Sequence, residues 1–227
     1  MEDIGRALAA AIAQGEDARG HTSPNPPVGA AILDRTGELV GQGATQPAGG
    51  PHAEVMALRE AGERAAGGTA VVTLEPCHHQ GRTGPCSQAL LDAGIDTVYY
   101  CQPDPNPLAT GGAEFLRDKG VNAECLDHEV AALVPWLTAV RNNRPSVTLK
   151  FAQTLDGFTA ALDGSSQWIT GEAARRHVHQ DRRRRDAIII GTGTAIADNP
   201  SLTARDGDRE FPEQPRRVVI GGRSLTG

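Results

Sequence analysis

The spacing of apolar side chains predicts that helices and strands alternate along most of the chain. Apolar residues that recur every three or four positions mark a helix face, and short apolar runs bounded by turn-forming residues mark strands. The pattern predicts helices over residues 2–19, 52–66, 113–119 and 128–141, with another beginning near residue 85. It predicts strands over residues 28–33, 38–44, 70–74, 95–101 and 121–126, the first two joined as a hairpin by a turn at residues 34–37. Such alternation favours a largely parallel sheet covered on both faces.

Residues 142–145 read as a linker, after which the alternation starts again. Beyond the linker, the pattern predicts strands over residues 146–152, 158–161, 187–190 and 217–220, and a helix over residues 171–184. We therefore predict two domains, residues 1–145 and residues 146–227. The second is shorter than the about 100–150 residues common for a domain. We expect it to be incomplete, with an open sheet edge that favours a homo-oligomer.

Composition and charge narrow the classes of protein. The chain has 227 residues, of which 39% are hydrophobic and 22% charged, an ordinary globular balance. No apolar run approaches the about 20 residues of a membrane helix, and the acidic N-terminus does not resemble a secretory signal. We therefore expect a cytoplasmic protein without a membrane partner. The net charge of −6 disfavours binding to nucleic acid.

The strongest chemical signal is one histidine and two cysteines in the first domain. His52 is followed two positions later by Glu54, and Cys77 and Cys86 flank a loop that leads into a predicted helix. One imidazole and two thiolates can bind zinc and leave a fourth position for water. Zinc lowers the pKa of such a water to about 7, and Glu54 is placed to transfer its proton. This arrangement is the signature of zinc-dependent nucleobase deaminases.

The loop between the two cysteines carries information about the substrate. It contains eight residues, whereas the general deaminase signature has the shorter C-x-x-C spacing. His78, His79 and Arg82 in this loop suggest a larger or phosphorylated substrate, with Arg82 as a phosphate or substrate clamp. Two plainer interpretations stay open. The histidines can lie at the loop surface, or one of them can be the fourth ligand of a structural zinc.

Longer motifs in both domains resemble those of a known family. The motifs span residues 23–29, 49–54, 73–86, 150–157, 166–170 and 186–205. They are similar to motifs of the bifunctional deaminase/reductase family of riboflavin biosynthesis, and the resemblance covers almost the entire chain. It implies an α/β protein in which a cytidine-deaminase-like three-layer α/β/α domain precedes an incomplete dihydrofolate-reductase-like α/β domain.

The resemblance also implies two consecutive reactions. Zn2+-dependent hydrolysis deaminates 2,5-diamino-6-ribosylamino-4(3H)-pyrimidinone 5′-phosphate, and NADPH then reduces the ribosyl group to ribityl. By this resemblance the zinc ligands are His52, Cys77 and Cys86, and Glu54 transfers protons. Together with the loop residues, the candidate substrate-binding residues are Asn25, His79, Arg82, Ser166, Arg182, Leu202 and Arg205. The implied nucleotide-binding residues are Ala152, Trp168, Thr194 and Asp198.

Other interpretations of these motifs stay open. A cytidine-type or tRNA-type deaminase would share the zinc signature, although the long loop and the second domain disfavour it. A non-catalytic, zinc-stabilised interaction module would also explain the ligands. Residues 182–185 can form a solvated helix face as readily as they can bind a phosphate. Residues 191–194 can form a plain turn at the end of a strand as readily as they can approach a phosphate. Because the family's reductase continues past residue 227, we expect deamination to be intact and hydride transfer to be lost or impaired.

Overall fold

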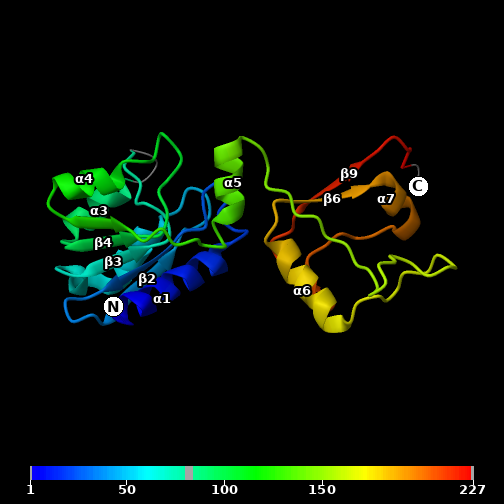
Figure 1. Cartoon of the computed structure of the whole chain (residues 1–227), viewed down its shortest axis with the longest axis horizontal. Helices are drawn as coiled ribbons and strands as arrows, with labels where there is room; N and C mark the ends of the chain where they lie inside the picture. Colours follow the sequence, from blue (N-terminus) through cyan, green and yellow to red (C-terminus); the bar gives the residue numbers. More distant parts are fainter. Residues whose placement is uncertain (1, 80–83, 226–227) are drawn as a thin grey trace. The chain divides into compact units, whose positions relative to one another are not determined.

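The computed structural model describes residues 2–79 and 84–225, and the chain divides into two compact units. Unit 1 comprises Met1–Ser146 and unit 2 comprises Val147–Gly227 (Figure 1). No helix in the described residues is both long enough and apolar enough to cross a lipid bilayer.

Unit 1 is built on a five-stranded mixed sheet of order β2-β1-β3-β4-β5. Its strands are β1 (Gly29–Leu33), β2 (Leu39–Ala44), β3 (Thr69–Val72), β4 (Thr97–Tyr100) and β5 (Asn122–Cys125). β1 runs antiparallel to β2 and β3, whereas β3, β4 and β5 are parallel. Four of the five strands therefore point the same way and only β1 is reversed, which confirms the prediction of a largely parallel sheet. A tight turn reverses the chain after β1, so the first two strands form an antiparallel hairpin.

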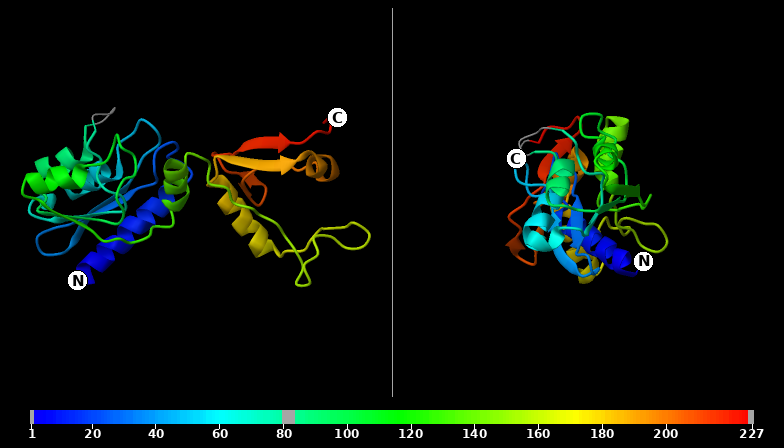
Figure 2. Two further views of the ribbon diagram at one scale, coloured as in Figure 1. Left: turned by 45° about the horizontal axis from the view of Figure 1, so that its top comes forward. Right: turned by 90° about the vertical axis from the view of Figure 1, so that its left-hand side faces the viewer.

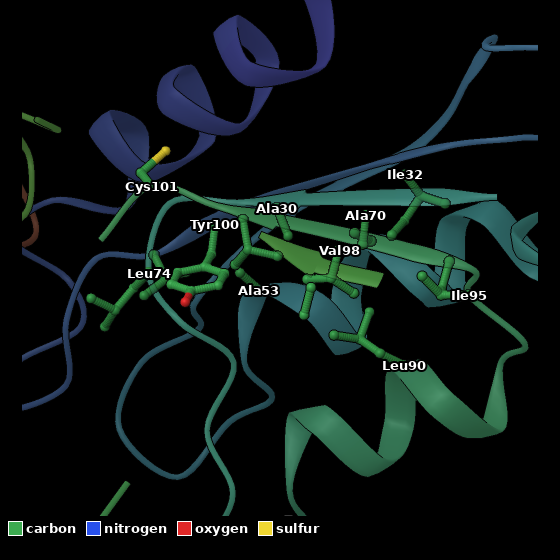
Figure 3. Packing of buried hydrophobic residues seen from close by; sticks show 14 of the residues in the cluster. Ala30, Ile32, Ala53, Ala70, Leu74, Leu90, Ile95, Val98, Tyr100 and Cys101 are labelled. Carbon is green, nitrogen blue, oxygen red and sulfur yellow. The ribbon is translucent and has the colours of Figure 1, made fainter. Parts of the chain in front are cut away.

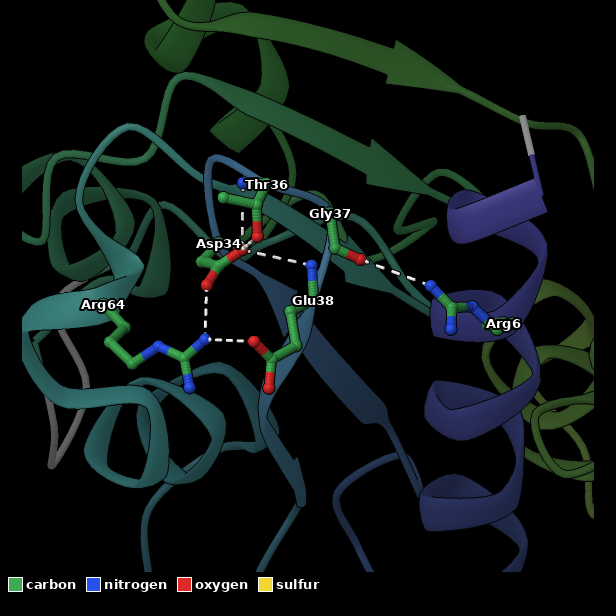
Figure 4. Close-up of polar contacts among 6 residues, drawn as sticks. All are labelled: Arg6, Asp34, Thr36, Gly37, Glu38 and Arg64. Atoms are coloured by element: carbon green, nitrogen blue, oxygen red, sulfur yellow. Dashed lines mark hydrogen bonds and ion pairs between the residues drawn. The ribbon is translucent and has the colours of Figure 1, made fainter.

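The turn between β1 and β2 is held by the carboxylate of Asp34 and the guanidinium of Arg64 (Figure 4). Asp34 accepts hydrogen bonds from the backbone N–H groups of Thr36 at 2.9 Å and Glu38 at 3.1 Å. Arg64, in the short 3-10 helix η1 (Gly62–Ala65), forms ion pairs with both Asp34 and Glu38. Hydrogen bonding by the Thr36 hydroxyl and then by Arg64 holds the pKa of Asp34 well below its ordinary value. These contacts tie the turn to the segment that follows the second helix.

Helices cover both faces of the sheet in unit 1. They are α1 (Glu2–Ala18), α2 (Ala53–Ala61), α3 (Cys86–Asp92), α4 (Gly112–Asp118) and α5 (Val134–Asn142). Ala31 and Leu33 of β1 pack with Ala7 of α1, whereas Ala30 and Ile32 belong to the larger core that includes α2 and α3. This alternation is expected of a strand with two buried faces. Figure 2 shows α1 on one side of the sheet and α2 on the other.

The core requires small residues where helices approach the strands most closely. A Cβ atom on Gly29 of β1 would lie 1.9 Å from the carbonyl oxygen of Ala11 in α1. A Cβ atom on Gly41 of β2 would lie 2.2 Å from the carbonyl oxygen of Ala57 in α2. Leu90 of α3, which is fully buried, fills the space next to the central strands (Figure 3). Glycine therefore permits both layers of helices to pack at short range.

Two predicted helices differ from the structure in their bounds. The helix predicted over residues 52–66 ends at Ala61, because Gly62 has a φ of +56° and the chain continues as η1. The helix predicted over residues 128–141 begins only at Val134, where Pro135 suits the first turn. Residues before it form turns, and Asp127 has a φ of +49°.

Unit 2 contains helices α6 (Glu172–Arg183) and α7 (Thr192–Asp198). Strands β6 (Ala187–Gly191) and β9 (Arg216–Ile220) form a parallel pair, and the short strands β7 (Arg205–Asp206) and β8 (Arg209–Glu210) form an antiparallel hairpin. The segment 191–194 is thus not a plain turn, because most of it belongs to the first turn of α7.

The strands predicted over residues 146–152 and 158–161 are not formed. In the described structure these residues take part in no strand ladder, and Val147, Leu149 and Phe151 are exposed. A strand needs a partner for its backbone groups, so an apolar alternating pattern is not sufficient on its own. Ile189 and Ile220 of the parallel pair are also more than half exposed, at 58% and 59%.

Candidate metal centre

Three candidate metal ligands converge at one end of the sheet in unit 1. His52 directly precedes α2, Cys77 follows β3, and Cys86 is the first residue of α3. Nδ1 of His52 lies 3.6 Å from Sγ of Cys77 and 3.3 Å from Sγ of Cys86. All three ligand atoms lie within 4.8 Å of one another, and both cysteines are buried. One nitrogen and two sulfur donors match the ligands that zinc prefers.

The strand order explains why residues so far apart in sequence meet. β2 and β3 both run antiparallel to β1, so they point the same way. His52 and Cys77 follow their C-terminal ends. Asn25 precedes β1, and therefore lies toward the same end of the sheet. Its turn is held by Thr22, whose hydroxyl donates to the carbonyl oxygen of Asn25 at 2.9 Å.

The ionisation of the two cysteines is unequal before any metal binds. Hydrogen bonding with Cys86 and then with His52 lowers the pKa of Cys77 to about 4. Hydrogen bonding with Cys77 and burial raise the pKa of Cys86 above its ordinary value. Hydrogen bonding with Cys77 also raises the pKa of His52. Cys77 is thus favoured as the thiolate and Cys86 as the thiol, and Cys86 would have to release its proton when a divalent cation binds both sulfur atoms.

Glu54 lies in the first turn of α2, two residues after His52, and its side chain is buried. Burial and then repulsion from Cys77 raise the pKa of Glu54 to about 7. A carboxyl group with such a pKa can both accept and release a proton near neutral pH. Among the described residues, Glu54 is not one of the three clustered ligands.

The histidines of the loop after Cys77 have different environments. Nδ1 of His78 lies 2.9 Å from the hydroxyl of Ser87, and its ring stacks on Phe115 with the ring centroids 4.3 Å apart. Nδ1 of His79 is buried and makes no hydrogen bond within the described residues. In residues 2–79 and 84–225, no further histidine, cysteine or carboxylate joins the cluster. Arg82 lies outside the described residues.

One acidic residue near the centre was missed by sequence reasoning. Asp104 follows β4 and is buried; burial and then repulsion from Glu75 and Cys77 raise its pKa. Attraction to His79 opposes this shift, so Asp104 is electrostatically coupled to the loop between the cysteines. Its position just beyond a parallel strand could have predicted it, because ligand-binding sites lie at the C-terminal ends of such strands.

Unit 2 brings together three of its predicted substrate-binding residues. Arg182 of α6 donates a hydrogen bond to the carbonyl oxygen of Thr203 at 2.6 Å, and Arg205 donates to the Thr203 hydroxyl at 3.4 Å. Leu202 directly precedes Thr203; it is buried and has a φ of +57°. Burial and then the charge of Arg205 lower the pKa of Arg182. Arg182 therefore does not belong to a merely solvated helix face.

The remaining predicted residues of unit 2 are not gathered in this way. Ala152 lies in the segment without strands, Ser166 and Trp168 are exposed beyond it, and Thr194 and Asp198 are exposed on α7. Trp168 stacks against Arg175, whose guanidinium carbon lies 4.2 Å from the ring centroid.

Comparisons with known proteins agree with the two-part organisation. Residues 1–102 match the family model described as the cytidine and deoxycytidylate deaminase zinc-binding region, and residues 145–226 match the RibD C-terminal domain. The chain is 61% identical over 226 residues to the riboflavin biosynthesis protein RibD of Corynebacterium ammoniagenes. That match covers 98% of this chain and 67% of the relative. The chain belongs to the RibD family.

Further RibD proteins support this assignment. RibD of Mycobacterium tuberculosis is 50% identical over 230 residues, which is 99% of this chain and 68% of that protein. The crystal structure of the deaminase/reductase from Thermotoga maritima is 37% identical and superposes with a TM-score of 0.91, covering 99% of this chain and 64% of that one. The chain thus spans about two thirds of its RibD relatives.

These comparisons confirm the fold class and the family. A cytidine-deaminase-like α/β domain precedes a RibD-type reductase domain, and the family is one of bifunctional deaminase/reductase enzymes of riboflavin biosynthesis. The zinc-binding region of the first model includes His52, Cys77 and Cys86. The family therefore favours a riboflavin-pathway enzyme over a cytidine-type or tRNA-type deaminase and over a non-catalytic module.

Proposed function

We propose that unit 1, corresponding to the predicted domain of residues 1–145, is a zinc-dependent hydrolytic deaminase. Its substrate would be 2,5-diamino-6-ribosylamino-4(3H)-pyrimidinone 5′-phosphate. The observation that carries the proposal is the convergence of His52, Cys77 and Cys86, whose ligand atoms lie within 4.8 Å of one another. The named activity of the T. maritima relative, a diaminohydroxyphosphoribosylaminopyrimidine deaminase, supports the substrate.

The chain's own residues divide the work of deamination. His52, Cys77 and Cys86 hold zinc, which when bound supplies a water of lowered pKa. Glu54 accepts a proton from the attacking water and later donates it to the departing amino group. A pKa of about 7 suits both transfers. Asn25 orients the pyrimidine.

The loop between the cysteines completes this substrate site. His79 has a buried Nδ1 without a partner in the described residues, so it can hydrogen-bond the substrate. Arg82 clamps the phosphate, because a guanidinium group suits phosphate oxygens.

Unit 2, the predicted domain of residues 146–227, would bind the substrate of the second reaction. The cluster of Arg182, Leu202 and Arg205 supports this role, with Ser166 as a further contact. NADPH would contact Ala152, Trp168, Thr194 and Asp198. Three of these four residues, Trp168, Thr194 and Asp198, are exposed and so are accessible to a nucleotide.

Two further properties belong to this proposal. Self-association is supported by the two-stranded pair β6–β9, since strand edges without a partner in the described structure favour contact with another chain. A cytoplasmic location is supported by the four cysteines, none of which forms a disulfide.

The decisive experiment measures ammonia release with two substrates. The zinc-loaded chain should deaminate the diaminopyrimidine phosphate and leave cytidine unchanged. Glu54→Gln should retain zinc and lose turnover, because the ligands remain while the proton carrier is removed. Activity that survives this substitution would refute the mechanism.

A further inference from the structure

A buried carboxylate outside the ligand cluster holds both ends of one loop. Glu75 lies between β3 and Cys77, and only 8% of its surface is exposed. Its Oε2 atom accepts a hydrogen bond from the backbone N–H of Asp104 at 3.2 Å. Its Oε1 atom accepts hydrogen bonds from the N–H groups of Gly111 at 3.2 Å and Ala113 at 3.1 Å. One oxygen therefore fixes the start of the loop and the other fixes its end.

The loop between these anchor points is braced internally. The Asp104 carboxylate accepts the N–H of Asn106 at 2.8 Å, and the Asn106 side chain accepts the N–H of Leu108 at 3.1 Å. The Asn106 carbonyl accepts the N–H of Ala109 at 2.9 Å. These hydrogen bonds brace residues 104–109 as local turns, and the Glu75 carboxylate anchors the segment 104–113 at its start and its end.

This loop lies directly against the metal ligands. Ala109 packs in a buried cluster with Cys77 and Cys86, and its carbonyl oxygen accepts the N–H of His78 at 2.9 Å. At the far end of the loop, a Cβ atom on Gly112 would lie 1.8 Å from the carbonyl oxygen of Pro76. The loop backbone therefore contacts Pro76 and His78, the two residues that flank Cys77.

We propose that Glu75 is a positioning residue of the metal centre. Its carboxylate holds the 104–113 loop over Cys77 and Cys86, and the loop keeps both thiolates in place and water out. A glutamine at this position has a single oxygen acceptor, so one end of the loop would lose its partner and face an N–H group. The catalytic part of this inference rests on the proposed deaminase function; the effect on metal retention does not.

A matched control exists in the same unit. Asp34 also accepts two backbone N–H groups, those of Thr36 and Glu38. It follows β1 at Leu33, which pairs with Thr69 at the start of β3, whereas Glu75 follows the end of β3. The two carboxylates thus lie at opposite ends of the sheet. Asp34→Asn should weaken the fold without reaching the metal centre.

The test follows loss of cobalt from the Co2+-substituted full chain, using thiolate-to-cobalt absorption and excess EDTA. Glu75→Gln should lose cobalt about 10–100-fold faster than the wild type, the usual range for residues that support metal ligands. Glu75→Asp, which keeps both oxygens on a shorter side chain, should fall between the two. Asp34→Asn should lose cobalt at the wild-type rate, even where its unfolding temperature is lower.

The possible outcomes separate the two proposals. Equal cobalt loss from the wild type and Glu75→Gln overturns the positioning role, as does equal acceleration by Asp34→Asn at matched stability. If Glu75→Gln does not fold, wild-type cobalt loss from Glu75→Asp overturns it. In the zinc-loaded chain, Glu75→Gln should also lower kcat for ammonia release more than it changes KM. A wild type without deaminase activity would refute the proposed function, while fast cobalt loss from Glu75→Gln would still support the positioning role.

Discussion

Replacing Glu54 by glutamine should stabilise the metal-free protein at neutral and alkaline pH while it removes deaminase activity. The pKa of Glu54 rises from 4.5 to about 7 in the folded chain, chiefly because the carboxyl is buried. Below the ordinary pKa the group is neutral in both the folded and the unfolded chain. As the pH rises toward 7, the unfolded chain releases its proton first, and unfolding becomes more favourable. The wild type therefore loses stability over this range, whereas the glutamine variant does not.

The size of the effect follows from the same shift. A difference of about 2.5 pKa units at about 1.36 kcal/mol per unit corresponds to about 3 kcal/mol of unfolding free energy. The stability of Glu54→Gln relative to the wild type should thus increase by about 3 kcal/mol between pH 4 and pH 8. Most of this increase should develop above pH 5.

Urea unfolding of the metal-free proteins across this pH range measures the effect. Glu63→Gln is the matched control, because Glu63 is exposed on η1. This control should show no comparable change between the two pH values. A difference between Glu54→Gln and the wild type that stays constant with pH would refute the argument that burial of Glu54 opposes its ionisation.

Three other substitutions, one of them with a control variant, test the core and the ligands. Leu90→Ala removes a fully buried side chain and should lower the unfolding free energy by about 2–5 kcal/mol in urea titrations. Gly29→Ala places a Cβ atom 1.9 Å from the carbonyl oxygen of Ala11 and should lower the unfolding free energy by at least about 1–3 kcal/mol. Gly5→Ala is its control and should not lower the unfolding free energy, because a Cβ atom there has no neighbouring atom within 4 Å. Cys86→Ser should abolish stoichiometric zinc binding, as measured by metal analysis after dialysis, because it removes one of two thiolates.

Much of unit 1 was predictable because its signals are local. A short apolar run marks β1, the turn after it predicts the hairpin with β2, and the combination of His52 with Cys77 and Cys86 is a sequence motif that needs no tertiary knowledge. The place of β1 between β2 and β3 was not predicted, because it depends on how α2 carries the chain across β1. Asp104 was missed for a related reason, since only the arrangement of β3 beside β4 brings it near Cys77.

In unit 2, apolar alternation along the sequence was not sufficient to predict which segments form strands. Val147, Leu149 and Phe151 alternate as a strand would, yet they are exposed and form no ladder in the described structure. A strand is stabilised by its neighbours, and no local signal says whether those neighbours are present. By contrast, α6 and β6 were predicted close to their observed bounds, although α6 has no buried residue and every position of β6 is at least partly exposed.

The coordination of the metal tests the central claim most directly. X-ray absorption of the zinc-loaded chain should show two sulfur ligands at about 2.3 Å and two nitrogen or oxygen ligands at about 2.0–2.2 Å. Of the light-atom ligands, only one should be an imidazole, so that His78→Ala and His79→Ala leave the spectrum unchanged. A second imidazole, or a spectrum altered by either substitution, would mean that the fourth position is closed by the protein and would contradict the account.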